Sequence, residues 1–181
     1  MLIHPDRSCL LVIDIQERMA PVIHQAEQTV SNCAWLIDIA NQLDVPVLAT
    51  EQYPQGLGTT LPSIRERIRP ENIIEKIHFS AMSDEEPSRV INAGERNQVI
   101  LVGMESHVCV LQTALELQQQ DREVYIVEDC VSSRSPADKA AALARFRQCG
   151  IYVVTREMVA FEWLRCAGTD RFREISKTYL R

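Results

Sequence analysis

The sequence predicts an α/β fold of three layers, in which a mostly parallel, Rossmann-like sheet of about six strands is covered by helices on both faces. Two observations predict it. Continuous apolar runs, such as CLLVI at residues 9–13 and QVILV at residues 98–102, are typical of strands that are buried on both faces. Segments with apolar residues at helical spacing alternate with these runs, which is typical of a parallel sheet with right-handed crossovers.

The same local patterns place each element along the chain. We predict strands at residues 9–13, 45–50, 72–76, 98–102, 123–127 and 151–154, and helices at residues 26–43, 83–93, 107–119, 136–148 and 158–166. The helix at 136–148 begins with proline and is closed by Gly150, an asymmetry that helix ends favour. Residues 51–69 hold two prolines and two glycines and are predicted to form a long loop, of the kind that is commonly functional.

Length and composition restrict the classes of protein to consider. The 181 residues suit one compact domain, and 46% hydrophobic with 24% charged residues is ordinary for a globular protein. The net charge of -6, with no block of lysine or arginine, disfavours nucleic-acid binding. No apolar run approaches the roughly 18 residues of a membrane span, and the segment before the first strand, residues 1–7, is short and polar. We therefore expect a cytoplasmic protein that does not bind membranes.

The six cysteines are scattered along the chain without CxxC pairs or nearby histidines. This spacing indicates neither a zinc site nor the disulfide framework of a small secreted domain. We therefore expect no metal and no cofactor, and mostly reduced, buried thiols.

Three groups that could take part in catalysis follow predicted strands: Asp14, Lys76, and the turn from Gly103 to Cys109. Ligands of open α/β sheets bind beyond the carboxyl ends of the strands, so these groups are expected at one edge. Cys109 is predicted in the first turn of a helix, where free N–H groups and the helix dipole favour a thiolate. The same N–H groups could hold an oxyanion.

Each of these residues also has a purely structural interpretation. Asp14 could cap a helix that starts near Ile15, Lys76 could be a solvated surface residue, and Cys109 could be a buried helix residue facing the sheet. His107 lies two residues from Cys109, and side chains two apart on a helix do not face each other. A Cys–His pair is therefore not indicated.

Four motifs together resemble the isochorismatase-like cysteine hydrolase family, a superfamily that includes nicotinamidases and N-carbamoylsarcosine amidase. They follow one another along nearly the whole chain, each at a predicted strand end: LLVIDIQ (10–16), EKIHFSAM (75–82), VGMESHVCV (102–110) and EDCVSSRS (128–135).

The resemblance implies a catalytic triad of Asp14, Lys76 and Cys109. It also implies a cis peptide bond between Met104 and Glu105, which would aim the backbone N–H groups of Glu105 and Cys109 at one oxyanion position. Members of the family are commonly homo-oligomers, so the resemblance implies a homo-oligomer here as well.

The implied reaction is hydrolysis of a small amide-like (C–N) or related carbonyl substrate through a thioester. Asp14 would accept the thiol proton, Cys109 would attack the carbonyl, and water would then release the acyl group. Four residues are expected to line the substrate pocket: Gln16, Tyr53, Phe79 and Ser80.

Two departures narrow the substrate. Nicotinamidases carry a metal site with an aspartate and several histidines after the second strand, whereas ATEQYPQGLGTT at residues 49–60 has no histidine. Zinc and nicotinamidase activity are therefore not expected. True isochorismatases lack the cysteine at the nucleophile position. Because Cys109 is present there, isochorismate hydrolysis is not expected.

Two rival hypotheses stay open at this point. One is a non-catalytic scaffold or interaction protein that keeps the fold, although an intact triad argues against it. The other is a thiol redox enzyme that uses Cys109, with Cys130 as the candidate resolving cysteine near the same edge. The C-terminal helix with Phe161, Trp163 and Leu164 is equally compatible with an oligomer interface and with the core.

Overall fold

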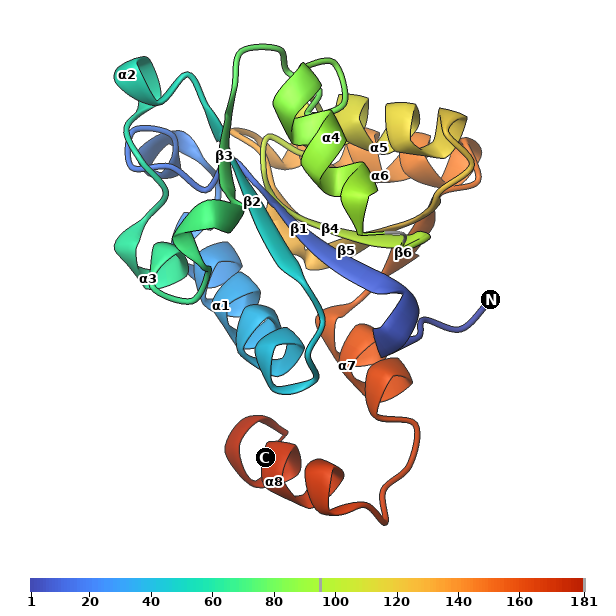
Figure 1. The fold of residues 1–181 in the computed structure, drawn as a ribbon. Helices are drawn as coiled ribbons and strands as arrows, with labels where there is room; N and C mark the ends of the chain where they lie inside the picture. Colours follow the sequence, from blue (N-terminus) through green and yellow to red (C-terminus); the bar gives the residue numbers. More distant parts are fainter. Residues whose placement is uncertain (95, 181) are drawn as a thin grey trace.

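The computed structural model describes residues 1–94 and 96–180 and confirms the predicted α/β architecture. All six strands join one parallel sheet in the order β3-β2-β1-β4-β5-β6 (Figure 1). The strands are β1 (Ser8–Ile13), β2 (Val47–Gln52), β3 (Ile73–Lys76), β4 (Gln98–Met104), β5 (Glu123–Ser132) and β6 (Tyr152–Val154). The order reverses between β1 and β4, which makes the carboxyl ends of these two strands the topological switch point.

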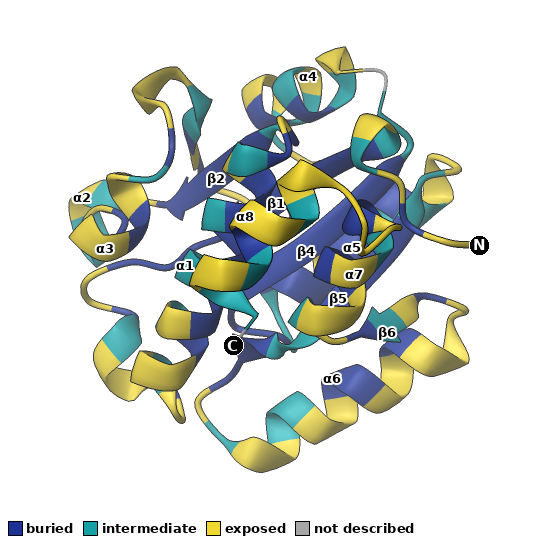
Figure 2. Ribbon diagram, turned by 90° about the horizontal axis from the view of Figure 1, so that it is seen from below, coloured by how far each residue is buried: buried dark blue, intermediate teal, exposed yellow. Residues whose placement is uncertain are grey.

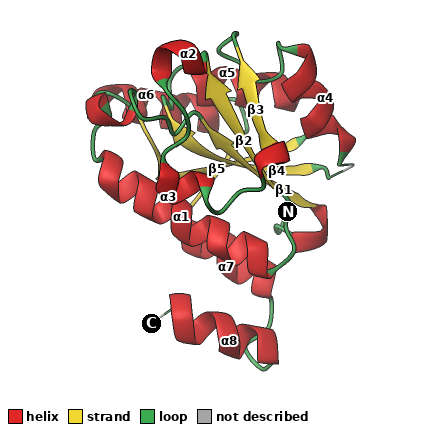
Figure 3. Ribbon diagram, turned by 60° about the vertical axis from the view of Figure 1, so that its left-hand side comes forward, coloured by secondary structure: helices red, strands yellow, loops and turns green. Residues whose placement is uncertain are grey.

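Helices cover both faces of the sheet, as Figure 3 shows from the side. One face is covered by α1 (Ala26–Gln42) and α7 (Arg156–Leu164), with α8 (Asp170–Tyr179) packed against α1. The other face is covered by α4 (Glu85–Ala93), α5 (Cys109–Gln119) and α6 (Pro136–Gln148). The connections hold the short helices α2 (Pro54–Leu57) and α3 (Pro62–Arg65) and the 3-10 turns η1 (Pro5–Arg7), η2 (Ala20–Val22) and η3 (Pro70–Asn72). No helix in the described ranges is long and apolar enough to cross a membrane.

The central strand β1 is buried on both faces, as its continuous apolar run predicts. Leu10 and Val12 belong to the hydrophobic cluster under α1 and α7, whereas Leu11 and Ile13 belong to the cluster under α5 and α6. Alternate side chains of a strand point to opposite faces, which gives the sheet two separate cores. Figure 2 shows the strands as the buried interior and the outer helix faces as the exposed surface.

The C-terminal region differs from the prediction. The last helix of the prediction begins earlier, at Arg156, because Thr155 caps it by accepting a hydrogen bond from the Met158 N–H. A further helix, α8, follows and was not predicted. It packs against α1, and the indole N–H of Trp35 donates to the Tyr179 carbonyl at 2.9 Å.

The same region shows which C-terminal side chains belong to the core. Trp163 and Leu164 are buried in the cluster under α1, so they are not available as a surface. Phe161 stays 48% exposed and is the part of this helix that a partner could contact.

Candidate active site

A buried ion pair lies at the carboxyl edge of the sheet. Lys76 Nζ, at the end of β3, is 2.8 Å from Asp14 Oδ2, directly after β1, and both side chains are fully shielded from solvent. Removing two charges from water costs several kcal/mol per ion unless each is paired and hydrogen-bonded. The surface and helix-cap interpretations of Lys76 and Asp14 are therefore wrong, because neither residue contacts solvent and no helix begins at Ile15.

Strand β2, which lies between β1 and β3, holds both charges in place. Thr50 Oγ1 donates to Asp14 Oδ1 at 2.7 Å, and Gln52 Oε1 accepts from Lys76 Nζ at 2.6 Å. The ammonium also donates to the carbonyls of His78 and Phe79, at 3.3 and 3.0 Å. Asp14 Oδ2 has no hydrogen-bond partner among the described residues, although it lies 2.8 Å from Nζ.

Cys109 is the first residue of α5 and is only 2% exposed. Burial raises the pKa of its thiol well above the ordinary range, and the negative charge of Asp14 raises it further. The positive charge of Lys76 lowers this pKa but does not offset burial. Burial therefore opposes the thiolate that the helix N-terminus was expected to favour.

The turn before Cys109 departs from the prediction in a second respect. The Met104–Glu105 peptide bond is trans, and the chain turns instead through a left-handed Glu105 with φ of 60°. Val108 N–H closes this turn on the Glu105 carbonyl at 2.9 Å, which delays the start of the predicted helix to Cys109. The N–H groups of Glu105 and Cys109 donate to no protein atom in the described ranges, so both remain available as donors.

Three of the strands that meet here end in a strained residue. Asp14 follows β1 with φ of 50°, Tyr53 follows β2 with φ of 38°, and Glu105 follows β4 with φ of 60°. Non-glycine residues seldom adopt positive φ, and such strain gathers at functional sites. The strain at this single edge supports a functional role for it.

The Glu105 carboxylate is a site feature that the sequence did not reveal. It is buried, and its Oε1 accepts from Arg134 Nε at 2.8 Å, whereas Oε2 has no hydrogen-bond partner in the described part of the chain. The negative charge of Glu105 adds to the raised pKa of Cys109. The motif around Arg134 was recognised, but only the fold shows that its guanidinium reaches the turn before Cys109.

Two of the predicted pocket residues are committed to the protein itself. The Gln16 amide donates to the carbonyls of Gln52 and Gly58 and accepts from the Gln52 N–H. The Ser80 hydroxyl donates to Glu116 Oε2 at 2.8 Å and accepts from the Met82 N–H. Both side chains are buried, so we assign them to anchoring loops instead of binding substrate.

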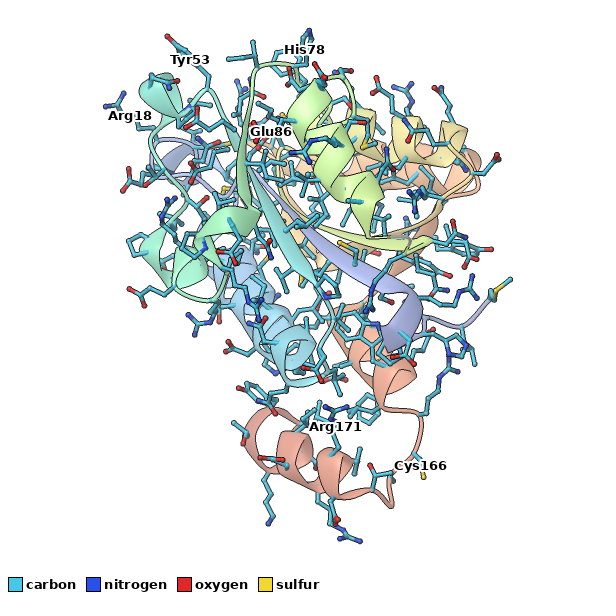
Figure 4. All side chains as sticks on the ribbon, viewed as in Figure 1. Arg18, Tyr53, His78, Glu86, Cys166 and Arg171 are labelled. Atoms are coloured by element: carbon cyan, nitrogen blue, oxygen red, sulfur yellow. The ribbon has the colours of Figure 1, made fainter. Side chains whose placement is uncertain are left out.

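The two predicted aromatic residues lie at the surface of the same molecular edge. Tyr53 is 52% exposed and Phe79 is 53% exposed. Figure 4 shows Tyr53 and His78, the neighbour of Phe79, projecting at one end of the molecule, opposite Cys166 and Arg171. The aromatic pair therefore remains available to a substrate or a partner.

The fold separates the two cysteines of the redox hypothesis. Cys130 packs in the cluster under α1, beside Cys33, whereas Cys109 belongs to the cluster under α5 and α6. Cys130 lies near the carboxyl end of β5, as expected, but the sheet lies between the two thiols because they pack on opposite faces. Among the described residues, no three histidine, cysteine, aspartate or glutamate side chains are grouped to hold a metal ion.

Comparison with known proteins agrees with this geometry. The model of the isochorismatase domain family matches residues 8–158, which include Asp14, Lys76 and Cys109. The chain belongs to the isochorismatase family. Isochorismatase domain-containing protein 2 of Danio rerio is 40% identical over 171 residues, covering 94% of this chain and 85% of the relative. The secreted isochorismatase effector Isc1 of Phytophthora sojae is 35% identical, over 96% of this chain and 84% of its own.

Two solved structures share the whole fold. The MAR1 ribonuclease of Caenorhabditis elegans superposes with a TM-score of 0.92 at 36% identity, covering 100% of this chain and 93% of its own. The YcaC gene product of Escherichia coli, an octameric hydrolase of unknown specificity, superposes with a TM-score of 0.93 at 20% identity, covering 99% and 91%. Membership of this hydrolase family supports a hydrolase function for the chain.

Proposed function

We propose that this protein is a metal-independent cysteine hydrolase that cleaves a small amide-like (C–N) or related carbonyl substrate with Cys109, Asp14 and Lys76. The buried Asp14–Lys76 ion pair is the observation that carries the proposal. Two well-packed apolar residues would stabilise a core at least as well as such a pair, which therefore favours a chemical role. A scaffold protein would have no use for it beside a buried thiol.

The first half of the reaction forms a thioester. Asp14 Oδ2 accepts the thiol proton as Cys109 Sγ bonds to the substrate carbonyl carbon, and the carbonyl π electrons move to oxygen. The free N–H groups of Glu105 and Cys109 stabilise this oxyanion. When the oxyanion collapses, the C–N bond breaks, and Asp14 returns its proton to the leaving amine.

The second half releases the acyl group. A water molecule attacks the thioester carbonyl while Asp14 accepts one of its protons, and collapse of the second oxyanion breaks the C–S bond. The departing sulfur takes the proton from Asp14, which restores the thiol and yields a carboxylic acid. The raised pKa of Cys109 fits this sequence, because a thiol that is protonated at rest needs a base at the moment of attack.

Lys76 acts on the carboxylate and not on the substrate. Its ammonium holds the Asp14 carboxylate in place through their direct pairing at 2.8 Å. Tyr53 and Phe79 form the outer wall of the proposed pocket, where their exposed rings can contact an apolar part of the substrate.

The proposal is tested with 4-nitrophenyl acetate, a chromogenic acyl donor, and with a panel of small primary amides. We expect a burst of 4-nitrophenol from the wild type and an acetyl group on Cys109 in the quenched reaction. Cys109→Ala and Asp14→Asn should each lower turnover by at least about 1,000-fold with the fold intact. Cys149→Ala is the matched control, because Cys149 is an exposed cysteine far along the chain from this edge.

Near-normal turnover in Cys109→Ala would contradict the proposal. Acetylation that appears equally on Cys149 and Cys166 would also contradict it, since these two exposed thiols report only on chemical reactivity.

RNA is a second candidate substrate, favoured by one observation: the 36% identical Caenorhabditis elegans structure is that of a MAR1 ribonuclease. The net charge of -6 weighs against it, because nucleic-acid affinity depends on neutralising phosphates. Cleavage of labelled single-stranded RNA by the wild type and by Cys109→Ala would decide between RNA and the amide-like substrate. Cleavage that requires Cys109 would replace the amide substrate with RNA.

We further propose that residues 1–181 act as one hydrolase domain in a cytoplasmic homo-oligomer. One sheet unites the six strands, and α8 packs back on α1. All six cysteines are free thiols, as is usual in a reducing compartment, although the Phytophthora sojae relative is a secreted effector. The octameric state of YcaC and the exposed Phe161 support an assembly, which sedimentation or light scattering would test.

A further inference from the structure

The turn that follows Lys76 holds the ammonium as well as the chain. Lys76 is the last residue of β3, and the next residues curve over its side chain, so that the carbonyls of His78 and Phe79 both accept from Nζ. These two carbonyls, with Gln52 Oε1, fix the position of Nζ against Asp14. Anything that fixes this turn therefore also fixes the ion pair.

Asp84 ties the beginning of this turn to its end. Its Oδ2 accepts from the N–H groups of Ile77 and His78, both at 2.9 Å. Its Oδ1 lies 2.7 Å from His78 Nδ1. Although burial raises the pKa of Asp84, the hydrogen bonds from His78 and Ile77 lower it overall, which keeps the carboxylate ionised.

Asp84 does not serve the helix whose N-cap it occupies. It directly precedes α4, where an aspartate commonly accepts from the first N–H groups of the helix. In the described structure its side chain caps no N–H of α4, and its carboxylate contacts Ile77 and His78 instead. The Asp84 side chain therefore stabilises the turn after Lys76 and not the first turn of α4.

The remainder of the turn is fixed on the helix that carries the nucleophile. The Ala81 N–H donates to Thr113 Oγ1 at 3.0 Å, and the Ser80 hydroxyl donates to Glu116 Oε2 at 2.8 Å. Thr113 and Glu116 lie on α5, which begins at Cys109. The turn is thus held between Asp84 at one side and α5 at the other.

We propose that Asp84 is a positioning residue for Lys76: its carboxylate fixes the 77–84 turn, whose carbonyls hold the ammonium against Asp14 beside Cys109. The inference rests on the proposed function. It adds Asp84, which lies outside the four sequence motifs that carry the family resemblance. Asp84 does not touch Lys76 Nζ and acts through the backbone of the turn.

The experiment measures alkylation of Cys109 by iodoacetamide at pH 8 in the full-length protein, with each cysteine followed separately by mass spectrometry. Lys76→Ala removes the positive charge that lowers the pKa of Cys109, so it should slow alkylation of Cys109 by about tenfold, which corresponds to about one pKa unit. Asp84→Ala should slow it in the same direction, by about threefold to tenfold.

Two matched variants separate positioning from charge and from stability. Asp84→Asn keeps a carbonyl oxygen that can accept from the turn, so it should restore alkylation to within about twofold of the wild type. Glu86→Ala removes a negative charge from the first turn of the same helix, and Glu86 is exposed, so it should behave as the wild type. Asp84→Ser, whose hydroxyl can cap α4, replaces Asp84→Ala if that variant does not fold.

The outcomes separate the positioning role of Asp84 from the proposed hydrolase function. If Cys109 responds to Lys76→Ala but not to Asp84→Ala, the positioning role of Asp84 is overturned and the triad stands. If Lys76→Ala itself has no effect, the proposed function fails. Faster alkylation of Cys109 in Asp84→Ala, together with buried Cys9, would show general loosening of the fold and would also overturn the positioning role.

Discussion

Asp14 lies at the centre of the contacts that join strand β2, Lys76 and Cys109. It receives the Thr50 hydroxyl on one oxygen and lies beside the Lys76 ammonium on the other, and its charge reaches the Cys109 thiol. Its backbone adopts a left-handed φ of 50°, which aspartate tolerates better than most residues. A single carboxylate at the switch point thus links three strands to the nucleophile.

Asp14→Asn is predicted to separate thiol reactivity from turnover. The charge of Asp14 raises the pKa of Cys109, so its removal should lower that pKa and make iodoacetamide alkylation at pH 8 faster by several-fold, about 3- to 10-fold. Turnover should be lost nevertheless, because no base remains. Alkylation of exposed Cys149 serves as the internal reference, and slower alkylation of Cys109 in this variant would contradict the assigned electrostatics.

The positions of the three proposed catalytic residues could be predicted from sequence, whereas their physical states could not. Asp14, Lys76 and Cys109 each follow an apolar run, and the carboxyl ends of parallel strands meet at one edge. The raised pKa of Cys109 depends on how tightly α5 packs, which no local pattern encodes. Gln16 and Ser80 were likewise predicted as pocket residues because sequence does not show which backbone groups their side chains reach.

At the scale of elements, the site depends on the close approach of β1 and β4. Gly103 pairs with Ile13 at the end of the two strands and adopts φ of 131°. A Cβ atom there would lie 2.1 Å from the Ile13 carbonyl oxygen, which is backbone and cannot move aside. Only glycine allows both strands to end side by side, with Asp14 and the nucleophile turn directly after them.

Gly103→Ala is therefore predicted to destabilise the protein strongly. The overlap with β1 and the positive φ should together lower the free energy of unfolding by about 3 kcal/mol or more, measured by urea denaturation. Gly94→Ala is the matched control, because its Cβ would meet only the Arg96 side chain at 3.9 Å and its φ is -80°. An equal and small effect of both substitutions would show that the strands separate easily at this edge.

Strands with a continuous apolar run and helices with apolar residues at helical spacing were predictable, whereas the C-terminal helix α8 was not. The six strands are found where the sequence predicts them, although β5 continues to Ser132 through the polar residues 128–129. Helix α8 has few apolar residues and is held by tertiary packing of Ile175 and by the Trp35 hydrogen bond. Its formation depends on a surface of α1 that lies far away in sequence.

At the scale of the whole molecule, the sheet divides the interior into two cores, and buried thiols lie in both. Cys9 and Cys109 lie in one hydrophobic cluster, and Cys33 and Cys130 lie in the other. A thiolate of Cys9, Cys109 or Cys130 would lose its hydration, and the nearby positive charges do not offset this loss. Burial therefore favours the protonated form of these three thiols.

This arrangement predicts that the protein loses stability at alkaline pH. Burial raises the pKa of Cys9 to about 12, and the pKa values of Cys109 and Cys130 are raised as well. A group whose pKa is higher in the folded state stabilises fully below its unfolded pKa, near 9, and progressively less as the pH rises toward the folded pKa. Each such thiol should cost about 1.4 kcal/mol per pH unit in that range.

Urea denaturation at pH 7.5 and pH 10.5 measures this loss directly. The free energy of unfolding should fall between the two values, and Cys9→Ala should reduce the fall by about 2 kcal/mol, because one titrating thiol is gone. Cys149→Ala should leave the fall unchanged, since Cys149 is exposed in the folded protein. If the wild type and Cys9→Ala lose the same stability, Cys9 ionises as readily in the folded chain as in the unfolded one, and water must reach the core beside β1.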